Sequence, residues 1–302
     1  MDFTATGTAA EPLCPLCNTA AGRVCCDYGT TKIIRCHGCG LWRACPRLSP
    51  PELAAYYEQH YYSDELQQAG QYDTWRRRHA DVWRTNARLV LREARRRGLG
   101  HGGAVTVLDV GCGHGFFLEE CGALSLPTGG DARGTTSVPL VARGIDTSPQ
   151  AVKYAAEELK LDVRAMPLDE LPAAERYDVI TLWGVLEHVP QPLRTMEQVR
   201  AHLNPGGMTW VMTPNTNALE RFLKGAQYFN FLNRSHLTHF HRGTLRALLL
   251  RAGFTNVRRC IHWGGGSRRG PAALAQYAAR WLCLGTELRF IAETESASVA
   301  PR

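Results

Sequence analysis

Short apolar runs alternate with helix-forming stretches through the middle of the chain. The runs lie at residues 105–110, 141–146, 161–165 and 177–183, and their β-branched and apolar residues are typical of strands covered on both faces. Helical patterns begin near Phe116, Pro149 and Val185. This alternation predicts an α/β domain with a parallel sheet. A final run at residues 282–293 predicts an antiparallel strand at one edge of that sheet.

Residues 75–97 have a different pattern, in which six positions recur at helical spacing among nine arginines. These positions are Trp75, His79, Val82, Asn86, Leu89 and Val90. The spacing predicts an amphipathic helix that packs on the main domain and keeps the arginines in solvent. The alternative is a contact with a polyanion or phosphate, which the net charge of +7 would also suit.

Seven of the eleven cysteines lie within the first 45 residues. Four of them form two C-x-x-C pairs, Cys14 with Cys17 and Cys36 with Cys39, separated by eighteen residues. Two such turns bring four thiolates to one tetrahedral zinc ion. Because four thiolates leave zinc no open coordination position, we expect a structural ion in a zinc ribbon. The spare cysteines of this region are expected to be small buried residues; they are Cys25, Cys26 and Cys45.

The first strand of the α/β domain ends in a turn with three glycines. Asp109 closes the strand, and the turn then contains Gly111, Cys112, Gly113 and Gly115. Glycines there permit positive φ angles and let backbone N–H groups approach a ligand at a helix N-terminus. The spacing is acidic-x-G-x-G-x-G, which differs from the G-x-G-x-x-G fingerprint of nucleotide-binding dehydrogenases.

The second strand ends in another carboxylate, Asp146, which Thr147 follows. A carboxylate there can accept hydrogen bonds from both hydroxyls of a ribose, and the alternative is that it only caps the next helix. Asp131 competes for the ribose, although it lies in the loop-like stretch 126–138. An apolar slot for an adenine ring is expected after the third strand, formed by Met166, Pro167 and Leu168 with Asp169 or backbone groups at its polar edge.

Four segments together resemble the class I S-adenosylmethionine-dependent methyltransferases, among them the small-molecule enzymes that include the ubiquinone-biosynthesis O-methyltransferases. The segments are VLDVGCGHG, GIDTSPQAV, YDVITLWGVLEHVPQP and LNPGG. The resemblance implies a Rossmann-like sheet of seven mostly parallel strands with helices on both faces. It also implies roles toward the cofactor: Gly111, Gly113 and Gly115 pass its methionine part, Asp109 orients its amino group, Asp146 holds its ribose, and Trp183 lies beside it.

A histidine suits the chemistry, because methylation of a hydroxyl requires a proton to be removed near neutral pH. His188 stands where the similar phosphobase methyltransferases carry a catalytic histidine in D-x-x-x-H, but Gly184 replaces the acidic residue of that pattern. His239 is the second candidate for the base, and the residues expected to orient the base are Glu187, His236 and His241. A further alternative is a metal ion held by the histidines at positions 236, 239 and 241.

The sequence therefore predicts a methyltransferase that uses S-adenosylmethionine, contains structural zinc and acts on a small molecule of the natural-product or sugar-tailoring type, most readily at oxygen. The alternatives are an rRNA base methyltransferase with an N-terminal zinc module and a non-enzymatic zinc-ribbon adaptor. We expect a small-molecule acceptor as partner, no membrane and no nucleic acid, while a homodimer stays open. The absence of a signal-peptide pattern and of a spanning segment favours the cytoplasm.

Three regions are expected along the chain. Residues 1–48 form the zinc ribbon, residues 49–100 a helical cap or lid, and residues 101–295 the methyltransferase domain. The acceptor is expected to contact side chains from residues 56–75 and 215–241, and neither segment carries a motif for one acceptor chemistry.

Overall fold

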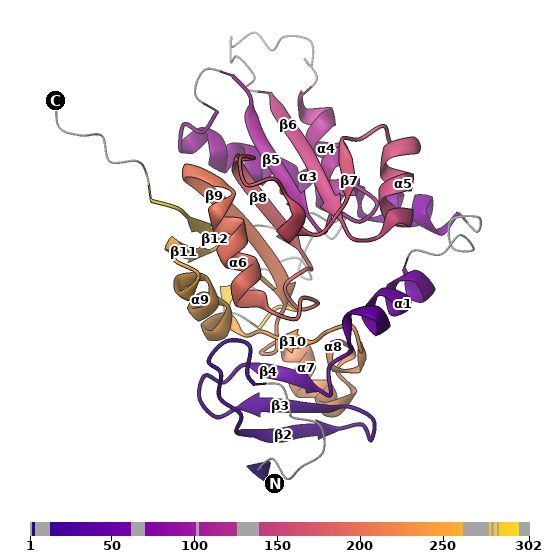
Figure 1. Ribbon diagram of the computed structural model, residues 1–302, viewed down its shortest axis with the longest axis vertical. Coiled ribbons are helices and arrows are strands. Elements are labelled where there is room, and N and C mark those ends of the chain that lie inside the picture. Colours follow the sequence, from indigo (N-terminus) through magenta and orange to yellow (C-terminus); the bar gives the residue numbers. More distant parts are fainter. Residues whose placement is uncertain are drawn as a thin grey trace, which may run out of the picture.

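The computed structural model describes residues 2–3, 13–61, 70–100, 103–125, 139–261, 278, 281–282 and 284–295. These residues form two sheets, of which the larger occupies the upper part of Figure 1 and the smaller the lower part. The larger sheet has the strand order β11-β12-β9-β8-β5-β6-β7, so the predicted seven-stranded, Rossmann-like α/β fold is confirmed. The loop expected at 126–138, and Asp131 with it, lies outside the described residues.

Five parallel strands form the centre and one side of the larger sheet. They are β5 (Val105–Val110), β6 (Leu140–Asp146), β7 (Val163–Ala165), β8 (Tyr177–Trp183) and β9 (Leu203–Pro214). The third predicted strand is shorter than expected, since β7 begins at Val163. Leu161 instead precedes the strand and packs against the core under α4.

The last predicted strand lies inside the sheet rather than at its edge. β12 (Glu287–Glu293) runs antiparallel to β9 on one side and to β11 (Thr255–Arg259) on the other. The prediction of an edge strand was therefore wrong, because β11 takes the edge. Four of the five residues of β11 are polar, which suits an edge strand and explains why no apolar run marked it.

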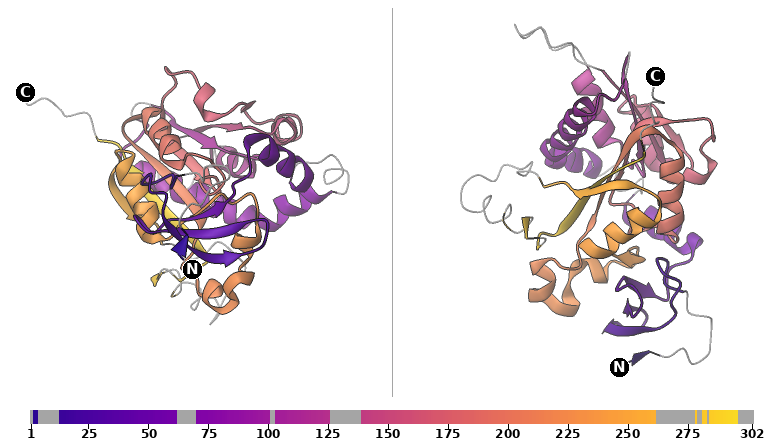
Figure 2. Two further views of the ribbon diagram at one scale, coloured as in Figure 1. Left: turned by 60° about the horizontal axis from the view of Figure 1, so that its bottom comes forward. Right: turned by 90° about the vertical axis from the view of Figure 1, so that its left-hand side faces the viewer.

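Helices cover both faces of the larger sheet, as Figure 2 shows. On one face α3 (Gln71–Arg96) and α4 (Phe116–Ser125) share a core cluster with alternate β5 residues, Val105 and Val107. On the other face α6 (Pro192–Ala201) and α9 (Arg242–Arg251) share a cluster with Leu108 and Val110. This division follows from the period of two along a strand. α5 (Pro149–Glu157) packs beside β6 and β7.

The shorter elements surround this core. They are α1 (Pro50–His60), α7 (Leu219–Lys224), α8 (Phe229–Leu232) and the 3-10 turns η1 (Leu168–Glu170) and η2 (Gly225–Gln227). None of the helices in the described part of the chain is both long and apolar enough to cross a bilayer.

The amphipathic helix expected at 75–97 is α3. Asn86, Leu89 and Val90 are buried as predicted, whereas His79 is exposed. Four of the nine arginines at residues 75–97 form ion pairs, namely Arg76 with Glu119, Arg84 with Glu120, Arg96 with Glu93, and Arg97 with Glu93 and Glu293. Arg96 and the remaining five are exposed. The helix is therefore a packed structural element with arginine on its outer side.

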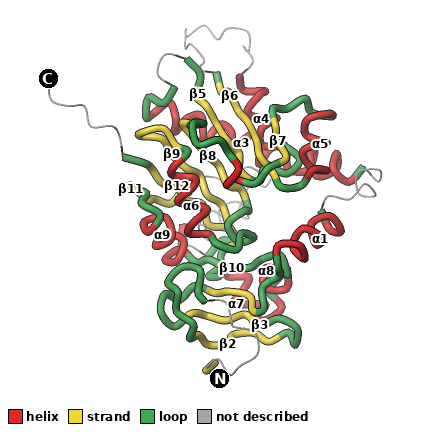
Figure 3. Tube along the Cα trace, viewed as in Figure 1, coloured by secondary structure: helices red, strands yellow, loops and turns green. Residues whose placement is uncertain are grey.

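The N-terminal sheet takes one strand from a distant part of the chain. Its order is β1 (Asp2–Phe3), β2 (Gly22–Asp27), β3 (Lys32–Cys36), β4 (Trp42–Cys45) and β10 (Thr238–His239). β10 pairs antiparallel with β4, which places this sheet directly below the larger one in Figure 3. Leu16 and Leu41 also share a core cluster with Leu245 and Leu248 of α9. The N-terminal region is thus joined to the larger domain by both a sheet and a core.

Candidate active site

A cavity of about 690 Å³ opens where β5, β6 and β8 end. The sheet side of the cavity is lined by Val110, Gly111, Ile145, Asp146, Thr147, Gly184 and Val185. α1 covers it from the opposite side with Pro50, Leu53 and Tyr57, followed by Tyr61 at the end of the helix. The carboxyl edge of a parallel sheet is where α/β folds bind ligands, and the volume is in the range of small-molecule pockets.

The glycine turn requires glycine for two reasons. Gly111, Gly113 and Gly115 have φ angles of 68°, 52° and 78°, in the left-handed region that other residues adopt at a cost of about 1–2 kcal/mol. A Cβ atom on Gly111 would also stand 2.6 Å from Cγ2 of Val185, and one on Gly115 would stand 2.4 Å from Cδ1 of Leu161. The turn thereby passes its backbone close to the cavity, which Gly111 lines.

Asp146 connects the cavity to this turn. Its Oδ2 accepts a hydrogen bond from the backbone N–H of Gly113 at 2.8 Å, and its Oδ1 accepts one from the N–H of Ser148 at 2.8 Å. Burial raises the pKa of Asp146, and the N–H donors partly oppose that shift. Ser148 caps α5 by accepting from the N–H of Ala151 at 3.2 Å. Asp146 is therefore not the side chain that caps the helix, and it lines the cavity.

Asp109, Cys112 and Trp183 do not line the cavity. Asp109 is buried, accepts a hydrogen bond from the Thr181 hydroxyl at 2.6 Å, and has its pKa raised to about 8 by burial. The Cys112 side chain packs against the Cα side of Gly144. Trp183 packs in the core against Trp83, Phe117 and Trp210. Of the ten residues predicted to bind the cofactor, five line the cavity: Gly111, Asp146, Thr147, Met166 and Pro167.

The apolar slot lies beside Asp146, after β7. Its lining residues are the expected Met166, Pro167, Leu168 and Asp169. The N–H of Met166 donates to the backbone carbonyl of Asp146 at 2.9 Å, so the slot is fixed next to the carboxylate. This arrangement can hold a planar ring beside a group that carries hydroxyls.

His188 lies in the cavity wall with one ring nitrogen engaged. Its Nδ1 donates to the carbonyl of Ser235 at 2.9 Å, so Nε2 is an unprotonated acceptor in the neutral ring. The ring meets Tyr57 edge to face, with 5.7 Å between centroids. Burial lowers the pKa of His188 to about 4, and the bond to Ser235 acts in the opposite direction. The imidazole is therefore neutral at physiological pH and can accept a proton.

Glu187 is buried behind His188, with its Oε1 3.9 Å from Nε2 of the histidine. Burial raises the pKa of Glu187 to about 7. The helix predicted around Val185 was wrong, because residues 186–188 form only a single turn and α6 begins at Pro192. A proline at position 190 keeps the preceding residue out of the helical region.

The three histidines proposed as metal ligands do not bring their ring nitrogens together as one ligand group in the described part of the chain, so that alternative was wrong. His236 uses both ring nitrogens, since Nδ1 donates to the Asn230 carbonyl at 3.1 Å and Nε2 accepts from Asn233 at 3.2 Å. His239 lies on β10 against the Phe231 ring and does not line the cavity. The Nδ1 of His241 accepts from the N–H of Gly243 at 3.0 Å and caps α9. Glu187 and His188 gather with His236 instead, with ligand-type atoms within 4.8 Å of one another.

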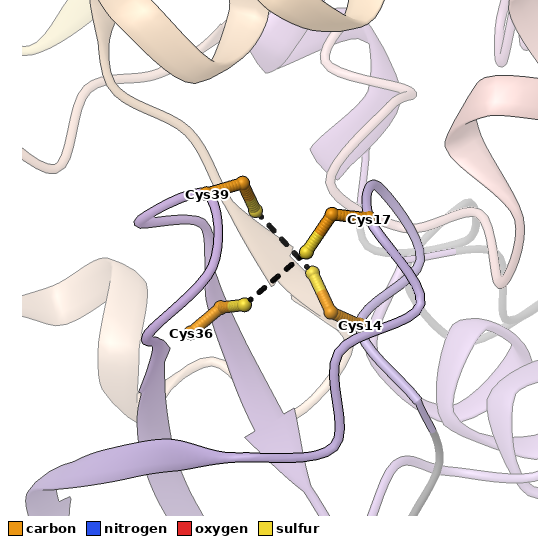
Figure 4. A group of neighbouring side chains, drawn as sticks. All are labelled: Cys14, Cys17, Cys36 and Cys39. Atoms are coloured by element: carbon orange, nitrogen blue, oxygen red, sulfur yellow. Dashed lines mark hydrogen bonds between the residues drawn. The ribbon is translucent and has the colours of Figure 1, made fainter.

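The four predicted zinc ligands converge, as Figure 4 shows. The sulfur atoms of Cys14 and Cys39 are 3.5 Å apart, and those of Cys17 and Cys36 are 3.4 Å apart. A tetrahedral zinc ion with bonds of about 2.3 Å needs sulfur atoms ~3.8 Å apart, so the set fits the ion with small movements. Of the spare cysteines Cys45 is buried, whereas Cys25 and Cys26 are half-buried.

Sequence reasoning did not identify two parts of this site. Tyr57 and Tyr61 line the cavity. The sequence has tyrosine pairs at 56–57 and 61–62, but their pattern does not distinguish packing from pocket lining. Asn233 and Ser235, which contact the candidate histidines, were not singled out. Their Asn-x-Ser spacing is a turn signal that could have drawn attention to them.

The comparisons with known proteins agree with this architecture. Residues 54–259 match the family model described as a methyltransferase domain. The ubiquinone biosynthesis O-methyltransferase of Paraburkholderia xenovorans is 31% identical over 160 residues, which cover 46% of this chain and 63% of that protein. The same enzyme of Bordetella pertussis is 36% identical over 118 residues, which cover 37% and 43%. The chain thus spans less than two thirds of the length of these relatives.

A solved structure resembles the chain in fold. It is a SAM-dependent methyltransferase from Thermotoga maritima, described as a possible histamine N-methyltransferase, and it aligns with a TM-score of 0.51 at 13% identity. The match covers 80% of this chain and 100% of that one.

Proposed function

Because this chain belongs to the class I S-adenosylmethionine-dependent methyltransferase family, we propose that it transfers the methyl group of S-adenosylmethionine to a hydroxyl of a small molecule. The observation that carries the proposal is one cavity lined by Gly111 of the glycine turn, by Asp146 and by His188, whose Nε2 is an unprotonated acceptor. We propose an acceptor of the natural-product or sugar-tailoring type.

The cofactor is proposed to lie along the sheet edge. S-adenosylmethionine supplies an electrophilic methyl group when bound. Gly111 lets the backbone approach its methionine part, Asp146 accepts from the ribose hydroxyls, and Met166 and Pro167 enclose the adenine ring. Asp109 is proposed to stabilise the turn, because the hydrogen bond that it accepts from the Thr181 hydroxyl links β5 to β8 next to the turn. Trp183 supports the same strand end from the core.

His188 is proposed as the general base. Its Nε2 would take the hydroxyl proton as the oxygen attacks, and the Glu187 carboxylate would stabilise the resulting imidazolium. A positioned base of this kind contributes about 10²–10⁴-fold to a rate. His239 is the weaker candidate, because it does not line the cavity and its ring packs against Phe231.

A small acceptor is favoured over an RNA base. α1 covers the cavity with Tyr57 and Tyr61, which leaves little access for a polynucleotide.

Zinc is proposed at the four cysteines, where it would stabilise the N-terminal sheet. The sulfur positions support this assignment. The ion would be structural, because four thiolates leave it no open coordination position for a substrate. The division of the chain at residues 48 and 100 is part of the same proposal. So is a cytoplasmic location, in which cysteines stay reduced and available to zinc.

The test uses the purified full chain with S-adenosylmethionine and a panel of phenols, catechols and sugar hydroxyls. Release of S-adenosylhomocysteine is followed, and the methylated atom is identified by NMR. We expect oxygen methylation, and we expect His188→Gln to lower kcat about 10²-fold or more while the Kd for S-adenosylmethionine changes less than threefold. A product methylated on nitrogen or carbon, or a His188→Gln enzyme as fast as the wild type, would contradict the proposal.

A further inference from the structure

Asn233 lies buried behind the cavity wall, and both polar atoms of its side chain are engaged. Its Oδ1 accepts from the N–H of Ser235 at 3.1 Å and from the Ser235 hydroxyl at 2.7 Å. Its Nδ2 donates to the hydroxyl of Tyr61 at 3.3 Å and to Nε2 of His236 at 3.2 Å. The Tyr56 hydroxyl reaches Oδ1 at 3.3 Å. One amide therefore links α1 and the residue that follows it, Tyr61, to Ser235 and His236.

These bonds permit a single arrangement of protons. The N–H of Ser235 can only donate, so the amide oxygen must face it and the NH₂ group must face His236. Nε2 of His236 is then an acceptor, and the proton is on Nδ1, which donates to the Asn230 carbonyl. Asn233 thus holds His236 in its neutral form. Burial, and then the neighbouring histidines, lower the pKa of His236 to about 2.

The same turn fixes His188. The bonds between Asn233 and Ser235 close an Asx turn, whose Ser235 carbonyl accepts from Nδ1 of His188 at 2.9 Å. The rings of His188 and His236 are 4.7 Å apart. A positive charge on His236 would therefore oppose the arrival of a proton on His188.

We propose that Asn233 is a positioning residue for methyl transfer, which fixes the tautomer of His188 and ties it to the closure of α1 over the cavity through Tyr61. The inference rests on the proposed role of His188 as base. Asn233 does not line the cavity, so it acts through Ser235, His236 and Tyr61.

Asn233→Asp changes the arrangement of protons around His236 but nearly keeps the shape of the side chain. The carboxylate keeps an acceptor for Ser235, but it presents an acceptor where His236 and Tyr61 now receive a donor. His236 should then bind a second proton and become an imidazolium near neutral pH. We expect kcat to fall about 10- to 100-fold with a smaller change in KM. Asn233→Ala removes every bond and should change both kcat and KM, because Tyr61 loses its support.

Long-range ¹H–¹⁵N NMR of the full chain labelled with ¹⁵N-histidine tests the inference without an acceptor. The signals are assigned with His188→Gln and His236→Gln. The groups that face His188 are Glu187 in its own turn, Tyr57 from α1, and His236 and His239 from the segment around β10. We expect both rings of the wild type to be neutral with the proton on Nδ1 near pH 7. We expect a charged His236 in Asn233→Asp and mixed His188 tautomers in Asn233→Ala.

Asn204→Ala is the matched control. Asn204 donates to Oδ1 of Asp178 at 2.9 Å, at the end of β8 opposite to His188, so the variant loses a structural amide bond and should leave both rings unchanged. Thermal unfolding checks that the variants fold, and the nearly isosteric Asn233→Asp decides the test if Asn233→Ala does not.

The inference would be overturned if His188 and His236 of folded Asn233→Asp kept the tautomers and the pH titration that they have in the wild type. Calorimetry with S-adenosylmethionine separates this result from failure of the proposed function. A wild type that does not bind S-adenosylmethionine would overturn the function, whereas normal binding with unchanged histidine signals would overturn the role of Asn233 alone.

Discussion

Replacing Gly111 by alanine should destabilise the fold through two separate penalties. The φ angle of 68° costs a residue with a Cβ about 1–2 kcal/mol. The new Cβ would also stand 2.6 Å from Cγ2 of Val185, whose β-branched side chain has a stiff χ1. Displacing Val185 should cost about 1–3 kcal/mol, typical of overpacking. Together the free energy of unfolding should fall by about 2–5 kcal/mol.

Gly29→Ala is the control that isolates the contact. Gly29 has a φ of 78°, and a Cβ there would meet nothing within 4 Å, so this variant has the backbone penalty alone. The difference between the two variants measures the clash with Val185. In a double-mutant cycle Val185→Ala should relieve that clash, with a coupling of about 1–2 kcal/mol.

Urea unfolding at constant m-value gives these free energies. Calorimetric titration with S-adenosylmethionine gives the effect on the site, where Gly111→Ala should raise the Kd at least tenfold because Gly111 and Val185 both line the cavity. Equal destabilisation by Gly111→Ala and Gly29→Ala, with no coupling to Val185, would refute the reasoning.

Three further predictions concern charge and metal. Glu187→Gln should remove a limb near pH 7 from the pH profile of kcat/KM, because burial raises the pKa of Glu187 to about 7 and its anion stabilises protonated His188; a limb that persists in the variant would assign it to another group. Cys36→Ser should release zinc, measured by elemental analysis, and lower the Tm, because the N-terminal region shares a core with α9; metal loss at unchanged Tm would speak against a structural ion. Asp109→Asn should flatten the dependence of stability on pH. Burial raises the pKa of Asp109 from 3.8 to about 8, so wild-type stability is full below the lower value and falls between the two by about 1.4 kcal/mol per pH unit. This prediction would be contradicted if the free energy of unfolding changed with pH by the same slope in Asp109→Asn and in the wild type between about pH 5 and 8.

Features set by neighbouring residues could be predicted from the sequence. The strands β5, β6 and β8 follow from apolar runs, and the turn at Gly111 follows from the spacing of glycines that adopt positive φ. The four cysteines also gather as expected, because each C-x-x-C pair is fixed within one turn and the two turns meet beside β3.

Features that depend on distant segments could not be predicted in this way. β10 has two residues without a strand pattern, and it is a strand because β4 offers a free edge. The partner of the His188 ring is a carbonyl 47 residues away, and Tyr61 meets Asn233 across 172 residues. Hydrophobic periodicity contains no information on such pairs, which only the assembled fold brings together.

The most direct test of the central claim is a calorimetric titration of the zinc-loaded full chain with S-adenosylmethionine, with Asp146→Ala beside it. We predict one binding site per chain in the wild type. Loss of hydrogen bonds to the carboxylate, at about 1.5–3 kcal/mol each, should weaken binding to Asp146→Ala by about 10- to 100-fold or more. A folded wild type that binds no S-adenosylmethionine, or a variant that binds it as tightly as the wild type, would contradict the assignment of this cavity.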